Sequence, residues 1–344
     1  MKRCTISTFL LAFCLLLASA AQAREITDMA GRKVTIPDDA RRVFGSAPPL
    51  NVLLHAIDPE AMIGLSFNVP PEAAPFFPSR LAALPVMGGV FGMGPQMNAE
   101  AVLAQKPDFA LAWQGPFVPV QRIDEAFRKM GLPAVFVKLD TLSDWPAALR
   151  FTGELLGKAE RGEALARYVE ESLSRLEKVR KLPDEKRVRV YYAEGPDGLA
   201  TDCHTSFHAE AFELAGGYNV YRCQASSHMG MEKVSIEQVL AFEPDVIVTF
   251  NRNLAASLRG KRPQDPRWQN VKAVREGRIY VAPQWPHNWI DRPPSYTRAL
   301  GALWLANIFY PAEFPLDLKA ETRKFYRLFY QLELSDAAFE QLFR

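Results

Sequence analysis

Two regular patterns of hydrophobic and polar positions alternate along the chain. Amphipathic stretches with helical spacing are separated by short runs that are apolar at almost every position. Such runs are typical of strands buried on both faces of a parallel sheet. They occur at 42–45 (RVFG), 109–113 (FALAW), 134–137 (AVFV), 188–193 (VRVYYA), 246–250 (VIVTF) and 278–282 (RIYVA). The pattern therefore predicts an α/β fold with helices on both faces of parallel sheets.

One helix-to-strand unit occurs twice in the chain. The segment AEAVLAQKPDFALA at 99–112 is matched by IEQVLAFEPDVIVT at 236–249, 137 positions later. A repeated unit of this kind predicts two doubly wound α/β lobes, each built on its own sheet. The two copies share Glu100/Glu237, Val102/Val239, Leu103/Leu240, Ala104/Ala241, Pro107/Pro244 and Asp108/Asp245.

Each copy carries its own start and stop signals. Asn98 and Ser235 precede the two helices, and we expect them to cap the helix N-termini. Pro107 and Pro244 follow the helices, and proline both lacks an amide donor and biases its predecessor away from helix. The sequence therefore predicts two short helices that end before the prolines, each followed by a buried strand.

A long stretch between the two copies has a helical pattern without interruption by strands. It runs from about Trp145 to Lys181 and contains the amphipathic segment ALARYVEESLSRLEKVRKL. We therefore expect one long helix at 145–182 to join an N-terminal lobe at 24–144 to a C-terminal lobe at 183–344. The chain after Arg292 is again mainly helical, in the segments TRALGALWLANIF and KAETRKFYRLFYQLEL.

The N-terminal residues have the pattern of an exported protein. Two positive charges lie within the first three residues, 9–18 is wholly apolar, and Ala21-Gln22-Ala23 is a small-x-small site before Arg24. This pattern predicts a signal peptide at 1–23, which is too short for a permanent membrane anchor. Phe13 stands directly before Cys14, where a lipoprotein signal would have small residues. We therefore expect a soluble exported protein.

Cysteine usage and charge narrow the interpretation further. Beyond the signal peptide only Cys203 and Cys223 remain. In an oxidising compartment they are expected to form a disulfide, which by loop entropy stabilises the fold by roughly 3 kcal/mol. Two thiolates on a metal are the alternative, although no CxxC spacing supports it. The formal net charge is +2 and no basic stripe is present, so nucleic acid is not an expected partner.

The order of several segments resembles a known family. These segments are ITDMAGRKVTIPDDARRVFGSAP, the two glutamate-containing repeats, FELAGGYNV, and PPSYTRALGALWLANIFYP. Together they resemble the substrate-binding proteins of ABC importers for iron–siderophores, haem and cobalamin, a group that includes molybdate and tungstate binders. The resemblance implies two lobes joined by a rigid helix, with the ligand in the cleft between them.

The same resemblance implies how such a protein works. It is a periplasmic monomer without enzymatic activity or intrinsic cofactor, and it delivers its ligand to an ABC permease dimer with its ATPase. In the family an exposed glutamate on each lobe docks on basic residues of the permease, and Glu100 and Glu237 occupy those positions. Without the resemblance, both residues are only first-turn acids that stabilise helix N-termini.

Candidate ligand-binding residues follow from strand polarity, because ligands of open α/β sheets bind beyond the carboxyl ends of the strands. Two histidines, His204 and His287, are also candidates to ligate a metal or to fill the open coordination positions of a chelate. For each histidine a hydrogen-bonded structural role is the alternative. The predicted ligand-binding residues are Ser46, Trp113, Gln114, Glu194, His204, Asn251, Arg252, Trp285, His287 and Arg292.

Tryptophans and arginines among these candidates favour one ligand class. Aromatic walls suit a macrocycle or a catecholate ring, and Arg252 and Arg292 suit a negative ligand. We therefore expect a metal complex, with an iron chelate such as a siderophore or haem first and a molybdate or tungstate oxyanion or cobalamin as alternatives. A secreted metal-dependent enzyme and a pure adaptor protein are rivals from other classes. The chain contains no GxSxG, HExxH or P-loop motif.

Overall fold

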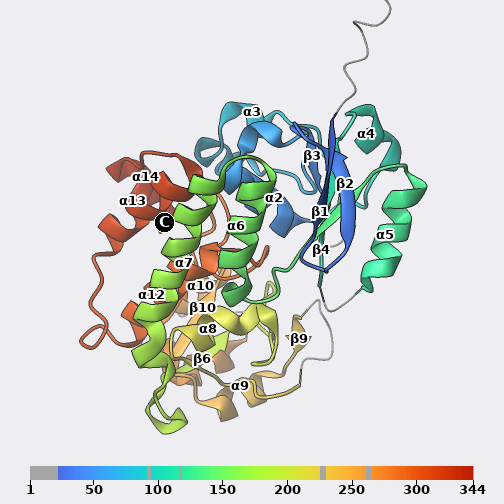
Figure 1. The fold of residues 1–344 in the computed structure, drawn as a ribbon. Helices are drawn as coiled ribbons and strands as arrows, with labels where there is room; N and C mark the ends of the chain where they lie inside the picture. Colours follow the sequence, from blue (N-terminus) through green and yellow to red (C-terminus); the bar gives the residue numbers. More distant parts are fainter. Residues whose placement is uncertain (1–21, 91–93, 116–117, 225–229, 261–264, 344) are drawn as a thin grey trace, which may run out of the picture.

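Two separate parallel sheets form the framework of the protein (Figure 1). The computed structural model describes residues 22–90, 94–115, 118–224, 230–260 and 265–343. The predicted signal segment lies almost wholly outside the described residues. The N-terminal sheet has the order β3-β4-β5, and the C-terminal sheet has the order β11-β10-β6-β8. The strands are β3 (Val43–Gly45), β4 (Phe109–Trp113), β5 (Ala134–Val137), β6 (Arg189–Tyr192), β8 (Tyr218–Asn219), β10 (Val246–Thr249) and β11 (Ile279–Val281).

Alternate residues of each strand face different cores, which confirms the prediction of sheets covered on both faces. Leu111 of β4 and Val248 of β10 belong to one large buried cluster that lies between the two sheets and includes the helices there. Ala110 belongs to a smaller cluster on the outer face of the N-terminal sheet. Ile247 belongs to the equivalent outer cluster of the C-terminal sheet. The six predicted apolar runs all form strands for this reason.

The repeated segments form equivalent helices, α4 (Ala99–Ala104) and α9 (Ile236–Phe242). The predicted caps are confirmed, since the side chains of Asn98 and Ser235 accept hydrogen bonds from the backbone amides three residues on. After each helix the chain enters the left-handed region, at Lys106 (φ 48°) and Glu243 (φ 45°). These two residues stand at the same place in the two copies, directly before the prolines.

The shared aspartates tie each repeat to the neighbouring strand. The Asp108 carboxylate accepts the backbone amide of Arg42 at 2.8 Å, and the Asp245 carboxylate accepts that of Arg189 at 2.9 Å. In return, the guanidinium of Arg42 donates to the Gln105 carbonyl and that of Arg189 to the Phe242 carbonyl, each at the C-terminus of the repeat helix. The same arrangement of side-chain-to-backbone hydrogen bonds therefore occurs twice, once beside each sheet.

The prediction of one long helix at 145–182 is wrong. The segment forms α6 (Trp145–Leu155) and α7 (Ala159–Arg180), which lie side by side (Figure 1). Gly157 adopts a left-handed conformation (φ 67°) and turns the chain back. The two helices approach closely at Gly153 and Gly162, where a Cβ added to Gly153 would lie 3.0 Å from Cα of Gly162. Both helices follow the same helical period, so their pattern does not reveal the turn between them.

The remaining helices fill the space between and around the sheets. Helix α7 packs against α12 and α8, and α2 packs against α6 and α13. A helical layer therefore connects the half of the molecule built on the N-terminal sheet to the half built on the C-terminal sheet. Among the described residues, no helix is both long and apolar enough to cross a membrane. The helices are α2 (Pro48–Ile57), α3 (Ser79–Ala82), α5 (Val120–Lys129), α8 (Glu210–Leu214), α10 (Arg252–Arg259), α11 (Lys272–Arg275), α12 (Thr297–Phe309), α13 (Leu318–Tyr330) and α14 (Asp336–Leu342).

Two small antiparallel pairs and one disulfide complete the fold. Strand β1 (Ala23–Thr27) pairs with β2 (Lys33–Pro37), and β7 (Ala200–Thr201) pairs with β9 (Glu232–Lys233). Cys203, just after β7, is joined to Cys223, as the sequence predicts. This bond ties the end of β7 to the segment that follows β8.

Candidate functional site

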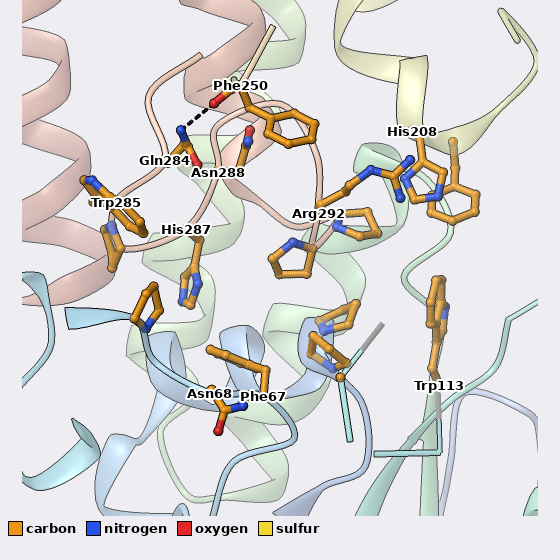
Figure 2. A pocket seen from close by; sticks show the side chains of 18 of the residues that line it. Phe67, Asn68, Trp113, His208, Phe250, Gln284, Trp285, His287, Asn288 and Arg292 are labelled. Atoms are coloured by element: carbon orange, nitrogen blue, oxygen red, sulfur yellow. Dashed lines mark hydrogen bonds between the residues drawn. The ribbon is translucent and has the colours of Figure 1, made fainter. Parts of the chain in front are cut away.

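A cavity of about 390 Å³ lies between the two halves of the molecule, at the carboxyl ends of β4, β10 and β11 (Figure 2). Its walls are mainly aromatic rings and prolines. The N-terminal half contributes Pro48, Pro49, Phe67, Asn68, Pro70, Gly94, Trp113, Gly115 and Val118. The C-terminal half contributes Phe207, His208, Phe250, Gln284, Trp285, Pro286, His287, Asn288, Arg292, Pro293 and Pro294.

Trp113, the last residue of β4, forms one aromatic wall. Its indole nitrogen donates a hydrogen bond of 3.0 Å to Asp140, and its ring meets Phe207 edge-on at 6.1 Å between centroids. These two contacts fix the orientation of the indole. A flat aromatic face is therefore presented to the cavity before any ligand arrives, which lowers the entropic cost of binding.

The loop after β11 supplies most of the opposite wall. Gln284 donates a hydrogen bond of 2.7 Å to the Phe250 carbonyl, drawn as the dashed line in Figure 2. The Trp285 carbonyl accepts from the hydroxyl of Tyr326 on α13. The Asn288 carbonyl accepts from Thr297 at 2.7 Å, at the start of α12. An irregular loop is thus held at three points by the elements around it.

His287 points from this loop toward Phe67 on the other side of the cavity (Figure 2). It is 4% exposed. Burial lowers the pKa of His287 well below its usual value, and the neighbouring His55 adds to this effect. The imidazole is therefore neutral at physiological pH, the form in which histidine ligates metals.

Arg292 reaches the cavity wall from a cluster of buried carboxylates. Its guanidinium lies 3.0 Å from Glu194, 3.1 Å from Asp202 and 3.3 Å from Asp291, and all three acids are fully buried. Asp291 also contacts Nδ1 of His208 at 2.6 Å. The positive charge of Arg292 is therefore balanced by the protein itself on the side away from the cavity.

Protonation within this cluster is uneven. Burial raises the pKa of Glu194 far above its usual value, and the hydrogen bond and charge of Asp202 raise it further against the pull of Arg292. Burial alone would lower the pKa of Arg292, but the charge of Asp291, together with that of Asp202, outweighs burial and raises it. We conclude that Glu194 is protonated at neutral pH and that Arg292 stays charged.

The structure brings four of the predicted ligand-binding residues together around the cavity: Trp113, Trp285, His287 and Arg292. Glu194 lies behind the cavity wall as a partner of Arg292. The other predicted residues do not line the cavity, and two have other contacts. Asn251 caps α10, and His204 accepts the backbone amide of Cys223 at 3.1 Å. The residues outside the lining are Ser46, Gln114, His204, Asn251 and Arg252.

The two predicted metal ligands are therefore not brought together. No helical turn joins His204 to His208, because 204–206 forms a turn and only a short 3₁₀ helix starts at Phe207. His208, which reasoning from the sequence did not choose, lines the cavity instead. Its place before the helix α8 gave no signal of a ligand site.

Glu100 and Glu237 lie on the surface, in the first turns of α4 and α9. Figure 1 shows these two helices far apart, one on each half of the molecule. Neither residue lines the cavity. Glu237 forms an ion pair with Arg267, which also binds Asp265.

Comparisons with known proteins agree on one group. Residues 88–285 match the profile of the family described as periplasmic binding protein. The chain is 28% identical to the molybdate-binding protein MolA of Haemophilus influenzae, over 91% of this chain and 92% of that protein. It is 27% identical to the vitamin B12-binding protein of Pectobacterium carotovorum, over 60% of this chain and 70% of that protein. A solved ABC transporter solute binding protein from Sulfurospirillum deleyianum has a TM-score of 0.86 and 33% identity, over 93% of this chain and 99% of that one.

Proposed function

This chain belongs to the periplasmic binding protein family, and from that premise we propose a ligand for its cavity: a metal complex with an organic shell, such as an iron chelate. Members of the family that serve ABC transporters bind a small ligand and work with a permease and its ATPase. On the same premise we place the protein in the periplasm, exported by the signal peptide at 1–23, where it acts as a monomer without enzymatic activity.

The observation that carries the ligand proposal is the lining of the cavity. Its volume of about 390 Å³ lies at the lower end of the range of roughly 300–1,000 Å³ that is usual for small-molecule sites. Trp113, Trp285, Phe67, Phe207 and Phe250 surround it, together with six prolines. Aromatic and proline surfaces favour the flat, apolar parts of an organic ligand rather than a small hydrated anion.

The charges around the cavity support the same choice. A bare oxyanion is held by several donors whose charge is free to balance it. Here the nitrogens Nε and Nη2 of Arg292 already face three buried carboxylates. The charge of an organic complex is largely balanced within its own shell, so such a ligand needs less positive charge from Arg292.

A molybdate-type oxyanion is the second candidate. The similarity to MolA extends over nearly the whole of both chains, whereas the vitamin B12-binding relative matches over 60% of this chain. Side-chain amides of Asn68, Gln284 and Asn288 line the cavity and could donate to an oxyanion. Cobalamin is the third candidate, suggested by the vitamin B12-binding relative, whose match covers a smaller part of this chain.

Calorimetric titration separates these ligands. We expect the purified mature protein to bind one ferric chelate or haem per chain. Trp113→Ala should weaken that binding by roughly 5- to 150-fold, since stacking on an aromatic side chain contributes roughly 1–3 kcal/mol. The exposed Phe343, which does not line the cavity, gives a matched control in Phe343→Ala. Binding of molybdate or tungstate with no response to any chelate would overturn the first candidate in favour of the second.

A further inference from the structure

Two buried histidines from opposite halves of the protein meet beside the cavity. His287 comes from the loop after β11, and His55 comes from helix α2 of the N-terminal half. They are 4% and 2% exposed. Their ring centroids lie 6.2 Å apart, with the ring planes at 80°. His55 was not among the residues chosen from the sequence, because it lies within a buried helix and not after a strand.

Neither ring has its hydrogen-bonding capacity satisfied. Among the residues that the structure describes, both nitrogens of His55 and Nε2 of His287 are buried without a hydrogen-bond partner. Each unsatisfied buried donor or acceptor has lost its hydrogen bonds to water without gaining a partner, which destabilises the folded state. Native proteins pair nearly all such groups, so three together in one place indicate a ligand for them.

Both rings are in the protonation state that a metal requires. Burial lowers the pKa of His55 to about 3, and the charge of Arg161 contributes. His287 is neutral for the same main reason, as described above. Neutral imidazole binds a metal ion without first releasing a proton.

Aromatic packing holds the two rings in place. His55 stacks on Phe77 with centroids 5.3 Å apart and planes at 20°. Tyr330 of α13 lies 5.4 Å from the ring of His55 and 6.0 Å from that of His287. Arg161 directs its guanidinium to the backbone carbonyls of Ala56 and Leu328 and so is already hydrogen-bonded to the backbone. The two rings are thus presented as a rigid pair.

We propose that His55 and His287 form a binding site for a borderline transition-metal ion such as Ni²⁺, Cu²⁺ or Zn²⁺, open to the cavity on the side of His287. Imidazole suits these metals, whereas Ca²⁺ and Mg²⁺ require oxygen ligands. A metal–nitrogen distance of about 2.0–2.1 Å places each ring centroid roughly 3.2 Å from the ion, so that two imidazoles on one ion have centroids at most about 6.4 Å apart. The observed 6.2 Å is just within that limit and places the two rings on nearly opposite sides of the ion.

The site would connect the two halves of the molecule. His55 belongs to the N-terminal half and His287 to the C-terminal half, so that one ion bridges both. The remaining coordination positions would face the cavity, where a chelate can fill them. The inference deepens the proposed function, because it identifies the ligand class as one whose metal has exchangeable positions.

Titration with the metal alone tests this inference. Untagged, chelator-treated protein is titrated with NiCl₂ and CuSO₄ by calorimetry, and the Cu²⁺ form is examined by electron paramagnetic resonance. We expect one ion per chain and a nitrogen hyperfine pattern from two imidazoles. His287→Ala and His55→Ala should each weaken binding by about tenfold or more, since even residues that only support a metal ligand contribute 10–100-fold.

Two controls keep the result interpretable. His204→Ala changes a histidine outside the cavity and should leave metal affinity unchanged. His55→Phe fills the same buried space but has no ring nitrogen. Circular dichroism and Tm show whether this variant is folded. A folded variant that does not bind metal shows that coordination, and not the fold, has been lost.

The outcomes distinguish this inference from the proposed function. Binding of a ferric chelate without binding of Ni²⁺ or Cu²⁺ alone overturns the metal site and leaves the proposed function in place. Binding of Ni²⁺ or Cu²⁺ without any response to chelates overturns the proposed function and leaves the metal site in place. Metal binding that survives in both His55→Phe and His287→Ala places the ion elsewhere and also overturns the site.

Discussion

At the scale of single residues, the charge of the cavity wall depends on a carboxyl group that is not charged. Arg292 faces Glu194, Asp202 and Asp291, and three ionised acids around one guanidinium would leave a buried excess of negative charge. Protonation of Glu194 removes one of these charges. A protonated Glu194 accepts a hydrogen bond from Arg292 and also hydrogen-bonds to Asp202.

Glu194→Gln tests this protonation state, because glutamine reproduces both hydrogen bonds. The pKa of Glu194 in the folded protein is raised above its ordinary value of 4.5, so folding takes up a proton above that pH. The stability that protonated Glu194 contributes is therefore lost as pH rises above 4.5. Glutamine does not titrate, so the stability of the Glu194→Gln variant does not fall with pH for this reason. The stability of the variant relative to the native protein should therefore rise between pH 5 and 8, by up to about 1.4 kcal/mol per pH unit.

Urea denaturation at several pH values gives the measurement. Asp202→Asn serves as the contrast, because it removes a carboxylate that binds both Arg292 and Ser206 and should destabilise the fold. A difference between Glu194→Gln and the native protein that stays flat across this pH range would show that Glu194 is ionised in the folded state.

Which site residues could be predicted from the sequence depends on where they stand in the chain. Trp113, Trp285, His287 and Arg292 follow strands or lie in the loops beyond them, and the polarity of a parallel sheet brings such loops together. His208 reaches the cavity from a position beside helix α8, and His55 lies next to the cavity on helix α2. Their positions depend on how α2 and α8 pack against the sheets, which no local pattern encodes.

At the scale of secondary-structure elements, the repeat has a structural cause that its sequence alone did not reveal. Asp108 and Asp245 each hold the start of the neighbouring strand, and an arginine there satisfies the last carbonyls of the repeat helix. The identities of the two copies were visible from the sequence. The role of Arg42 and Arg189 was not, because they lie 66 and 56 residues from their aspartates.

The hairpin of α6 and α7 depends on the close approach of two glycines. A Cβ added to Gly162 would lie 2.6 Å from the Leu149 carbonyl oxygen. Within a helix, alanine in place of glycine normally stabilises by roughly 0.5–1 kcal/mol. Here the clash should reverse the sign, and we expect Gly162→Ala to lower the free energy of unfolding by about 1–3 kcal/mol, as overpacking does.

Gly157→Asn is the matched control for this prediction. Gly157 has a left-handed conformation with open space around it, and asparagine tolerates that conformation better than other residues. We expect Gly157→Asn to lower the free energy of unfolding, measured by urea denaturation, by much less than Gly162→Ala does. Equal losses at the two positions would mean that α6 and α7 can move apart and that their contact is not tight.

At the scale of the whole molecule, the two halves share one buried core. The cluster between the sheets joins Leu111 of the N-terminal sheet to Val248 of the C-terminal sheet through the helices packed between them. Such a core resists relative motion of the halves, because packed interiors deform little. The surfaces of both halves are therefore held at a fixed separation, which suits recognition by a partner that also has two equivalent surfaces.

Glu100 and Glu237 are the proposed contacts with that partner, the permease dimer. Both are exposed, and they occupy the same position in helices α4 and α9. We expect Glu100→Ala and Glu237→Ala each to reduce ligand uptake into cells or vesicles that contain the permease, and the double variant to abolish most of it. Ligand affinity of the isolated protein should not change, because neither residue lines the cavity.

Glu185→Ala, at another exposed position, controls for the loss of one negative charge. If the two glutamates only stabilise their helices, each alanine should cost about 0.3–1 kcal/mol of folding stability and leave uptake intact. The ion pair of Glu237 with Arg267 gives a further discrimination. Arg267→Ala frees Glu237 for a permease arginine and should raise uptake if docking is the role of Glu237. Uptake should not change if Glu237 only stabilises its helix. Reduced uptake in Glu185→Ala to the same degree as in the two repeat variants would rule out docking at these sites.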